Sequence, residues 1–142
     1  MAFNQKFFMC NHCGNMVGLI ENKGVPLSCC GEPMEELVPN TVDASAEKHI
    51  PYVTGPDDMI SIQVGSVEHP MEEDHYIAFA YLETEKGGQR KNFKPGEPPR
   101  CEFRLKDDSP VAVYAYCNKH GLWAREKKFK SPPPVDMLTM RG

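Results

Sequence analysis

Cys117 and His120, near the end of the chain, have the residue types and the spacing of two metal ligands. A tight turn across the two intervening residues brings a thiolate and an imidazole to the same side, where both can bind one ion. No further Cys or His follows, so the pair needs ligands from upstream. Three histidines are available there: His49, His69 and His75. We expect these five side chains to meet at one site.

The number and types of these side chains narrow the chemistry of the site. Four imidazoles and one thiolate exceed the ligand set of tetrahedral zinc and suit a first-row metal such as iron. Such a set leaves one position of a six-coordinate metal open, which is typical of a reaction centre. A thiolate ligand donates electron density to the metal, as it does in haem oxygen chemistry. The sequence therefore predicts an iron that gives one electron to a small oxygen species.

A second set of ligands lies near the start of the chain. Cys10-x-x-Cys13 forms a knuckle with two sulfurs facing one cation, and Cys29-Cys30 completes a four-thiolate site. Adjacent cysteines normally point apart, so ligation by both requires a locally distorted backbone. Zinc and iron both accept four sulfurs, and a zinc clip that only stabilises the fold is an open alternative. His12 lies between two of the ligands and is interpreted as an exposed loop residue.

The elements around the four cysteines are short and separated by turns. Apolar runs over residues 6–10, 16–21, 25–29 and 34–38 are typical of short β-strands. Segments of this size bury little apolar surface and usually need a metal or disulfides to fold. The polar segment that follows predicts a boundary. We therefore expect a small metal-stabilised domain over residues 1–38 and a larger domain over residues 39–142.

The larger domain has the pattern of an all-β fold. Residues 59–65 and 100–106 alternate between apolar and polar side chains, and residues 111–117 place Val111 and Cys117 on the same face. The strand-like segments are 50–54, 59–65, 76–82, 85–93, 100–106, 111–117 and 122–129. About seven strands with turns between them predict an antiparallel β-sandwich. All candidate ligands of the second site then lie at strand ends, where one rim of the sandwich can gather them.

Charge and composition restrict the partners and the compartment. The formal net charge of −4 leaves no basic stripe that could release counterions from a nucleic acid or an anionic membrane. The sequence shows neither a signal peptide nor an apolar run long enough to span a bilayer. We expect a cytoplasmic protein with no nucleic-acid or membrane partner, in which the six cysteines are reduced. Cys101, on the inward face of its strand, is interpreted as a buried core thiol.

With these residues collected, the chain resembles the desulfoferrodoxins, the two-iron class of superoxide reductase. The resemblance covers nearly the whole chain and rests on four motifs in the same order. They are Cys10-x-x-Cys13 with Cys29-Cys30, Glu47-Lys48-His49-Ile50-Pro51, His69-Pro70-Met71-Glu72-Glu73-x-His75-Tyr76-Ile77 and Tyr116-Cys117-Asn118-x-His120-Gly121-x-Trp123.

The resemblance implies a fold, two cofactors and an activity. The small domain would be desulforedoxin-like, with one iron held by the four cysteines, and the larger domain a seven-stranded immunoglobulin-like β-sandwich. A second iron would have the four imidazoles of His49, His69, His75 and His120 in one plane and Cys117 as axial ligand. The implied reaction is one-electron reduction of superoxide to hydrogen peroxide, with electrons from rubredoxin or a similar carrier, in a homodimer.

Two charged residues beside His49 are candidates for catalysis. Superoxide is an anion approaching a protein of net negative charge, so a local cation at Lys48 would attract it. Lys48 could also orient a water that protonates the product. Glu47 could move onto the open position once the iron is ferric, because a hard cation favours a carboxylate. The alternative for both residues is a solvated loop charge; the resemblance assigns the catalytic roles, and we adopt them.

Two other functions fit parts of the sequence. The chain could be a non-enzymatic electron-transfer protein in which neither iron meets substrate, or a zinc-stabilised binding module with no redox role. An open coordination position beside Lys48 favours an enzyme over the electron-transfer protein. The metal content separates the binding module from the other two, because only they require iron in both sites.

Overall fold

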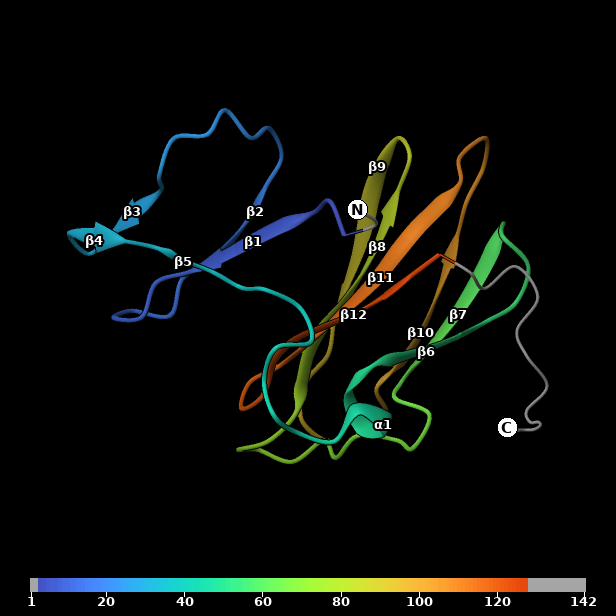
Figure 1. Cartoon of the computed structure of the whole chain (residues 1–142). Helices are drawn as coiled ribbons and strands as arrows, with labels where there is room; N and C mark the ends of the chain where they lie inside the picture. Colours follow the sequence, from blue (N-terminus) through green and yellow to red (C-terminus); the bar gives the residue numbers. More distant parts are fainter. Residues whose placement is uncertain (1–2, 128–142) are drawn as a thin grey trace.

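The structure is a computed structural model that describes residues 3–127. Figure 1 shows a small unit built from β1–β5 at one end and a larger unit built from β6–β12 at the other. The strands are β1 (Lys6–Met9), β2 (Met16–Leu19), β3 (Ser28–Cys29), β4 (Glu32–Pro33), β5 (Glu35–Glu36), β6 (Pro51–Thr54), β7 (Met59–Val64), β8 (Ile77–Thr84), β9 (Gly87–Asn92), β10 (Arg100–Arg104), β11 (Pro110–Cys117) and β12 (Gly121–Glu126), and one helical turn is α1 (Ala46–His49). No helix within residues 3–127 is long and apolar enough to cross a membrane.

The larger unit is a sandwich of two antiparallel sheets. One sheet has the strand order β10-β7-β6, and the other has the order β12-β11-β8-β9. Alternating residues of the facing strands fill the space between the sheets, including Ile60 and Ile62 from β7 and Phe103 from β10. The prediction of an all-β fold with a seven-stranded antiparallel sandwich is therefore confirmed. In β7 and β10 the alternating pattern places the apolar side chains inward.

Two details differ from the sequence prediction. The segment before β6 forms the helical turn α1, so His49 ends a helix where we had expected the head of a strand. The second difference concerns Val111, which packs with the residues on the outer face of its sheet. A register shift between Pro110 and Ala112 accounts for it, because a shift of one residue moves a side chain to the opposite face.

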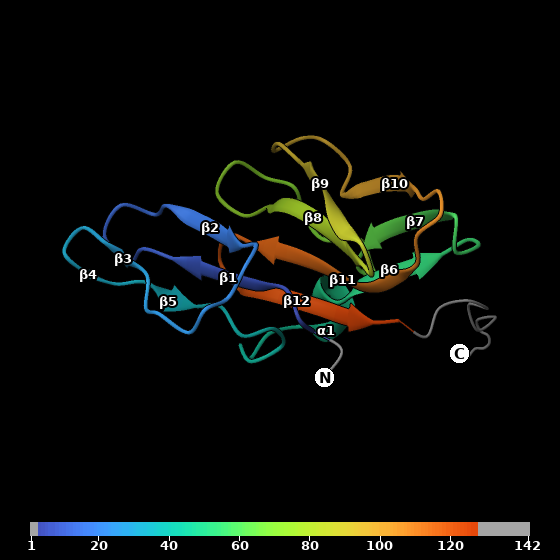
Figure 2. The ribbon, with the colours of Figure 1, turned by 90° about the horizontal axis from the view of Figure 1, so that it is seen from above.

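The small unit covers the outer face of the four-stranded sheet. Its centre is Phe7 of β1, whose ring lies 5.6 Å from that of Phe79, 5.5 Å from Tyr81 and 5.7 Å from Tyr114, measured between centroids. Figure 2 shows β1 lying beside β11 and β12 along this face. Phe7 and Tyr114 are both buried. The two units therefore share a second apolar core, and the small one is not a free appendage.

A buried carboxylate fastens the N-terminal segment to this sheet. Glu83 is 8% exposed, and its Oε1 atom accepts a hydrogen bond of 2.6 Å from the Tyr114 hydroxyl. The same oxygen accepts bonds of 3.3 Å from the backbone N–H groups of Asn4 and Gln5. A buried charge is tolerated when several donors satisfy it. Glu83 is therefore satisfied by three donors, and two of them hold the start of the chain in place.

Replacing Tyr114 with Phe should destabilise the protein. The substitution keeps the ring but removes the shortest donor to a buried carboxylate, so we expect a loss of about 1–3 kcal/mol in the free energy of unfolding. Urea unfolding of the iron-loaded protein measures it. Tyr52→Phe is the matched control, because Tyr52 is exposed on β6. Equal stability of the two variants would contradict the proposed role of Glu83.

Candidate metal centres

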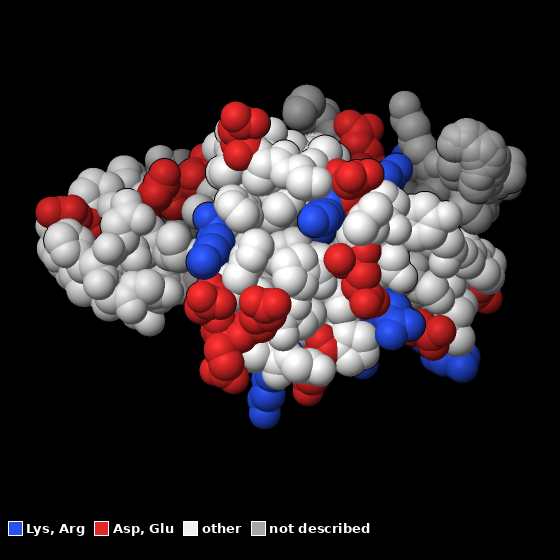
Figure 3. Space-filling model, turned by 90° about the horizontal axis from the view of Figure 1, so that it is seen from below, with Lys and Arg blue, Asp and Glu red and all other residues white. Residues whose placement is uncertain are grey.

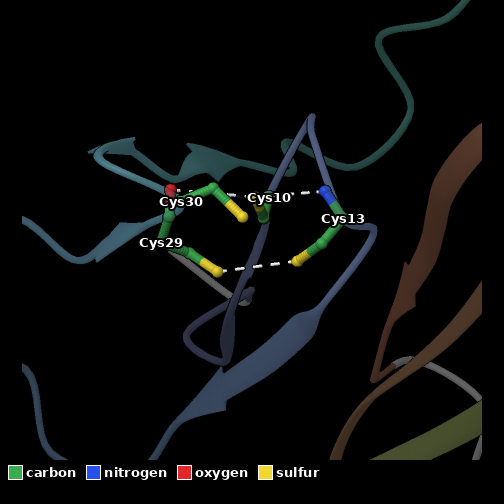
Figure 4. A group of neighbouring side chains, drawn as sticks. All are labelled: Cys10, Cys13, Cys29 and Cys30. Carbon is green, nitrogen blue, oxygen red and sulfur yellow. Dashed lines mark hydrogen bonds between the residues drawn. The ribbon is translucent and has the colours of Figure 1, made fainter.

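The four cysteines of the small unit converge on one point. Their sulfur atoms all lie within 4.8 Å of one another, and Figure 4 shows them turned toward a common centre. The Cys10 knuckle is closed by a bond of 3.0 Å from the Gly14 N–H to the Cys10 carbonyl, with Gly14 at a φ of 83°. Cys30 has a φ of 54°. The backbone distortion expected at the adjacent cysteines is therefore present, and it allows both sulfurs to face inward.

The four thiols can all be ionised together only if a cation lies between them. The Cys13 amide N–H, followed by that of His12, lowers the pKa of Cys10 to about 6. The neighbouring thiols, first that of Cys10, raise the pKa of Cys30 to about 12. One thiolate thus opposes the ionisation of the next, and the Sγ atoms of Cys13 and Cys29 are only 3.6 Å apart. Four thiolates can coexist here only around a metal ion, and this donor set suits iron or zinc.

His12 is exposed and pairs with Glu32 at 2.9 Å.

Three separate segments bring the second set of ligands to one rim of the sandwich. His49 ends α1, His69 and His75 lie between β7 and β8, Cys117 ends β11, and His120 immediately precedes β12. Ligand atoms of the first four lie within 4.8 Å of one another. His120 is outside that group, but its Nδ1 is 3.2 Å from His49 Nε2 and 3.9 Å from Cys117 Sγ. All five predicted side chains therefore meet.

The four imidazoles form a closed ring. Consecutive centroids are 4.6 Å apart for His49 and His69, 4.7 Å for His69 and His75, 5.1 Å for His75 and His120, and 5.0 Å for His120 and His49. On one side a pocket of about 300 Å³ opens to solvent, lined by all four histidines. Cys117 does not line the pocket; it is fully buried in the core between the sheets. The site thus has an open face and a thiolate on the core side.

Hydrogen bonds to backbone carbonyls fix the tautomers of two of these rings. His49 Nδ1 is 2.7 Å from the Ser45 carbonyl oxygen, and His69 Nδ1 is 2.7 Å from that of Pro70. A carbonyl only accepts, so each Nδ1 carries the proton and each Nε2 presents a lone pair. While both rings are neutral, these two lone pairs face each other at 3.1 Å with no proton between them. A metal ion between them removes the conflict, so the residues fit a cation.

Burial keeps these imidazoles in the metal-binding form. Desolvation is the largest cause that lowers the pKa of His49 and His75, and it lowers the pKa of His69 to about 4. The three rings are therefore neutral at neutral pH, as ligation requires. His75 Nε2 is buried and has no hydrogen-bond partner among the described residues. An unpartnered buried nitrogen is costly, and a metal ligand bond would satisfy it.

Sequence reasoning missed the residue that joins two of the ligand segments. The Asn118 side chain accepts a bond of 2.8 Å from the Tyr76 N–H and donates one of 3.1 Å to the Asp74 carbonyl. Its own N–H donates to the Tyr76 carbonyl at 3.1 Å. These bonds hold the turn after Cys117 against the segment that carries His75. In the sequence, Asn118 stands only within the Cys117 motif, and its one signal is that it is an amide beside a ligand.

Trp123 supports two of the four imidazoles, those of His49 and His120. Its ring stacks on that of His49 with centroids 4.8 Å apart and an interplanar angle of 24°. Its Nε1–H donates a bond of 3.0 Å to the carbonyl of His120. Because Trp123 is buried, it holds both the plane of His49 and the turn of His120. The single tryptophan therefore positions two ligands at once.

The turn α1 is held closely against the loop after β7. Val67 N–H donates a bond of 3.0 Å to the Glu47 carbonyl. A Cβ atom at Gly65 would lie 2.5 Å from that same oxygen and 2.9 Å from the Ile50 carbonyl oxygen, so only glycine permits this approach. Earlier in the chain, the Asn40 side chain accepts a bond of 2.9 Å from the Ala124 N–H on β12 and donates one of 3.1 Å to the Ala124 carbonyl. Both ends of the segment leading to His49 are therefore fixed.

The two candidate catalytic residues are exposed on α1. Lys48 lines the pocket over the imidazoles, together with Asp43 and Ser45. Glu47 is also exposed but does not line the pocket. Figure 3, viewed from the end of the molecule that carries α1, shows cationic and anionic side chains intermingled. Lys48 is therefore a local cation next to the open face.

Cys101 lies apart from both sets of ligands. It is half-buried and packs against the main core beside β7. Burial raises the pKa of its thiol to about 11, so it is protonated at neutral pH and a poor nucleophile. None of the six cysteines forms a disulfide. Cys101 therefore packs against the core as expected, but its thiol is half-buried where we had expected a buried one.

The fold and the two ligand sets define a class of protein: a metalloprotein in which a four-thiolate unit is joined to a β-sandwich with an imidazole–thiolate site. The chain matches the family described as Desulfoferrodoxin over residues 41–126 and the Desulfoferrodoxin, N-terminal domain, over residues 3–37. The chain belongs to the desulfoferrodoxin family. Both ligand sets are consistent with the predicted two irons per chain.

Similar proteins match over most of their length. The desulfoferrodoxin of Syntrophotalea carbinolica is 42% identical over 126 residues, which cover 89% of this chain and 99% of that protein. The desulfoferrodoxin of Nitratidesulfovibrio vulgaris is 41% identical, with the same coverage. Among solved structures, the superoxide reductase from Treponema pallidum is similar with a TM-score of 0.72 and 36% identity, covering 86% of this chain and 98% of that chain.

Replacing Asn118 with Ala should weaken metal binding at the second site and leave the four-thiolate site unchanged. The substitution releases the turn that carries Cys117 and His120, and losing such outer contacts typically costs about 10–100-fold in metal affinity. Competition with a chelator, followed by absorption spectroscopy of each centre, measures it. Asn92→Ala on the exposed strand β9 is the control. Unchanged affinity in the Asn118 variant would show that the ligand segments need no such link.

Proposed function

We propose that this protein is a superoxide reductase, which reduces superoxide by one electron to hydrogen peroxide. The observation that carries the proposal is the ring of four imidazoles with an open pocket on one side and the buried thiolate of Cys117 on the other. Similarity to the superoxide reductase from Treponema pallidum supports it. A protein that only carried electrons would not need a pocket above its metal ligands.

The proposed ligands of the catalytic iron are His49, His69, His75, His120 and Cys117. When bound there, a ferrous ion supplies one electron to superoxide at its open position. The chain's own residues prepare that position. Carbonyls of Ser45 and Pro70 orient two rings so that each Nε2 faces the centre. Burial of Cys117 excludes water from the thiolate, so its charge is directed at the metal and not at solvent.

We assign the handling of the anion and of protons to α1. The Lys48 ammonium lines the pocket and attracts superoxide to a protein whose overall charge is negative. Lys48 also orients a water that delivers a proton to the product. Glu47 is one residue away on the same exposed turn, and we propose that its carboxylate moves onto the open position after the reaction. Its backbone carbonyl is held by Val67, so only the side chain would move.

The four-thiolate site, formed by Cys10, Cys13, Cys29 and Cys30, would hold the other iron. We propose a small domain over residues 1–38 and a catalytic domain over residues 39–142, of which residues 128–142 lie outside the described part. The electron donor would be rubredoxin or a similar carrier. The protein would act in the cytoplasm, where its unpaired cysteines remain reduced.

Replacing Lys48 with Ile should lower the second-order rate constant for the reaction with superoxide by about tenfold, because local charge steers anions to a site. Pulse radiolysis of the reduced protein measures this constant. The difference from the wild type should shrink at high ionic strength, since salt screens the attraction. Lys86→Ile is the control, because Lys86 lies at the opposite end of β8. An unchanged rate constant would remove Lys48 from the mechanism.

The metal content of both proteins completes this test. Protein purified without added metal should contain two irons per chain, and Lys48→Ile should retain them, because Lys48 is not a proposed ligand. Zinc in both sites would overturn the proposal of an enzyme.

We also propose a homodimer that forms through the small unit. β2 is an edge strand of its sheet, and the residues along and after it are apolar and uncovered. Ile20 is 100% exposed, Val25 75% and Val17 39%. An edge strand with apolar neighbours is suited to pairing with a second copy.

Ile20→Lys should shift the protein from dimer to monomer, because it places a charge in the proposed interface. Sedimentation equilibrium measures the mass. Val38→Lys is the control, since Val38 is exposed near the boundary of the two units. A wild-type protein that sediments as a monomer would exclude this dimer.

A further inference from the structure

The two metal sites are connected by a contact between the buried side chain of Tyr116 and the half-buried side chain of Met9. The Tyr116 hydroxyl of β11 donates a hydrogen bond of 3.5 Å to the Met9 sulfur of β1. Met9 immediately precedes Cys10, and Tyr116 immediately precedes Cys117. Each member of the contact is therefore the sequence neighbour of a proposed thiolate ligand, one in each site. Along the path from Cys10 through Met9 and Tyr116 to Cys117, this contact is therefore the one step that is not covalent.

The contact lies within an apolar cluster, beside a pocket of about 400 Å³ that Tyr116 also lines. Tyr116 is 9% exposed, and its ring stacks on that of Phe79 with centroids 5.9 Å apart and an interplanar angle of 11°. Met9 packs against the same apolar core, between β1 and the four-stranded sheet. The thioether is a weak acceptor, so the hydroxyl gains little stability from it. A buried hydroxyl paired with a sulfur is an unusual choice where a phenylalanine would pack as well.

The two ends of the route are the atoms through which an electron would enter and leave. A thiolate shares electron density with the iron that it binds. The Cys10 sulfur extends the first centre into the chain, and the Cys117 sulfur extends the second. Electrons pass more readily through bonds and short contacts than across open space. Within residues 3–127, the segment Cys10–Met9, the contact and the segment Tyr116–Cys117 form such a path.

We propose that the contact between Met9 and Tyr116 carries electrons from the four-thiolate iron to the catalytic iron. This inference rests on the proposed function. In the step, one electron leaves the ferrous four-thiolate centre, which becomes ferric, and reduces the ferric catalytic centre to ferrous. No bond is formed or broken and no proton is transferred. Tyr116 and Met9 bridge the two centres and are not themselves oxidised, so the four-thiolate iron is a relay and not only a clip.

The test measures electron exchange without superoxide. A reducing pulse is applied to the fully oxidised, anaerobic protein with both irons bound, and absorption at the two centres is followed as the electron redistributes. Tyr116→Phe removes the hydroxyl and keeps the ring, and Met9→Leu removes the sulfur at similar volume. Tyr81→Phe and Met16→Leu are the matched controls, because both residues pack against the same core and neither is adjacent to a ligand.

We expect redistribution in the wild type at a rate independent of protein concentration. That rate should fall severalfold in Tyr116→Phe and in Met9→Leu and stay unchanged in both controls. The reduction potentials of the two centres are titrated in every variant, since a shifted potential also changes the rate. A fall in rate that the shifted potentials fully explain, or equal rates in all variants, would overturn the route. So would a wild type in which the two centres do not exchange electrons.

A separate measurement distinguishes this failure from that of the proposed function. The wild type with its catalytic iron reduced is mixed with superoxide, and the decay of superoxide is followed. A fast reaction with superoxide but no electron exchange between the centres would overturn the relay and support the proposed activity. Electron exchange without any reaction with superoxide would overturn the proposed superoxide reductase activity, and the relay would then have no catalytic purpose.

Discussion

Two imidazole nitrogens that face each other with lone pairs at 3.1 Å are the constraint on which the catalytic site depends. The carbonyls of Ser45 and Pro70 fix the proton of each ring on the far side, so neither ring can relieve the conflict by changing its tautomer. Protonation of either ring is disfavoured at neutral pH, because burial lowers the pKa of both. With both rings neutral, the two nitrogens therefore favour a metal ion between them. Part of the stability of this rim must come from the metal.

The rest of the sandwich serves to keep these rings in place while one face stays open. The ligands come from three segments separated by whole strands, so each segment needs its own anchor. Asn118 ties the segment of Cys117 to that of His75, Trp123 joins His120 to His49, and Gly65 lets α1 approach the loop after β7. These anchors are hydrogen bonds and ring contacts, not metal bonds. The open position can therefore persist without collapse of the ring.

The sequence predicted well which Cys and His side chains come together and where the strands lie, and it predicted the anchors poorly. Alternation in β7 and β10 indicated the core, because each strand buries one face. Cys and His residues at strand ends indicated the metal sites, because few roles other than metal ligation require these residue types at strand ends. The sequence could not reveal that Phe7 packs on the outer face of the four-stranded sheet, since that contact joins segments more than seventy residues apart in the printed sequence. Val111 and α1 depend on a register shift and on a backbone turn, neither of which has a compositional signal.

The shared core between the two units changes how the four-thiolate site should be understood. A clip for a small domain needs only to hold that domain together, and it could sit on a flexible linker. Here Phe7 and the bonds from Asn4 and Gln5 to Glu83 fix β1 and the residues before it against the sheet that contains β11, the strand that ends in Cys117. Such packing holds the distance between the two sites constant, which a clip does not require and an electron relay does. Fixing the small unit on the sheet costs conformational entropy that a flexibly linked unit would retain. The fixed packing therefore favours a functional connection between the two centres.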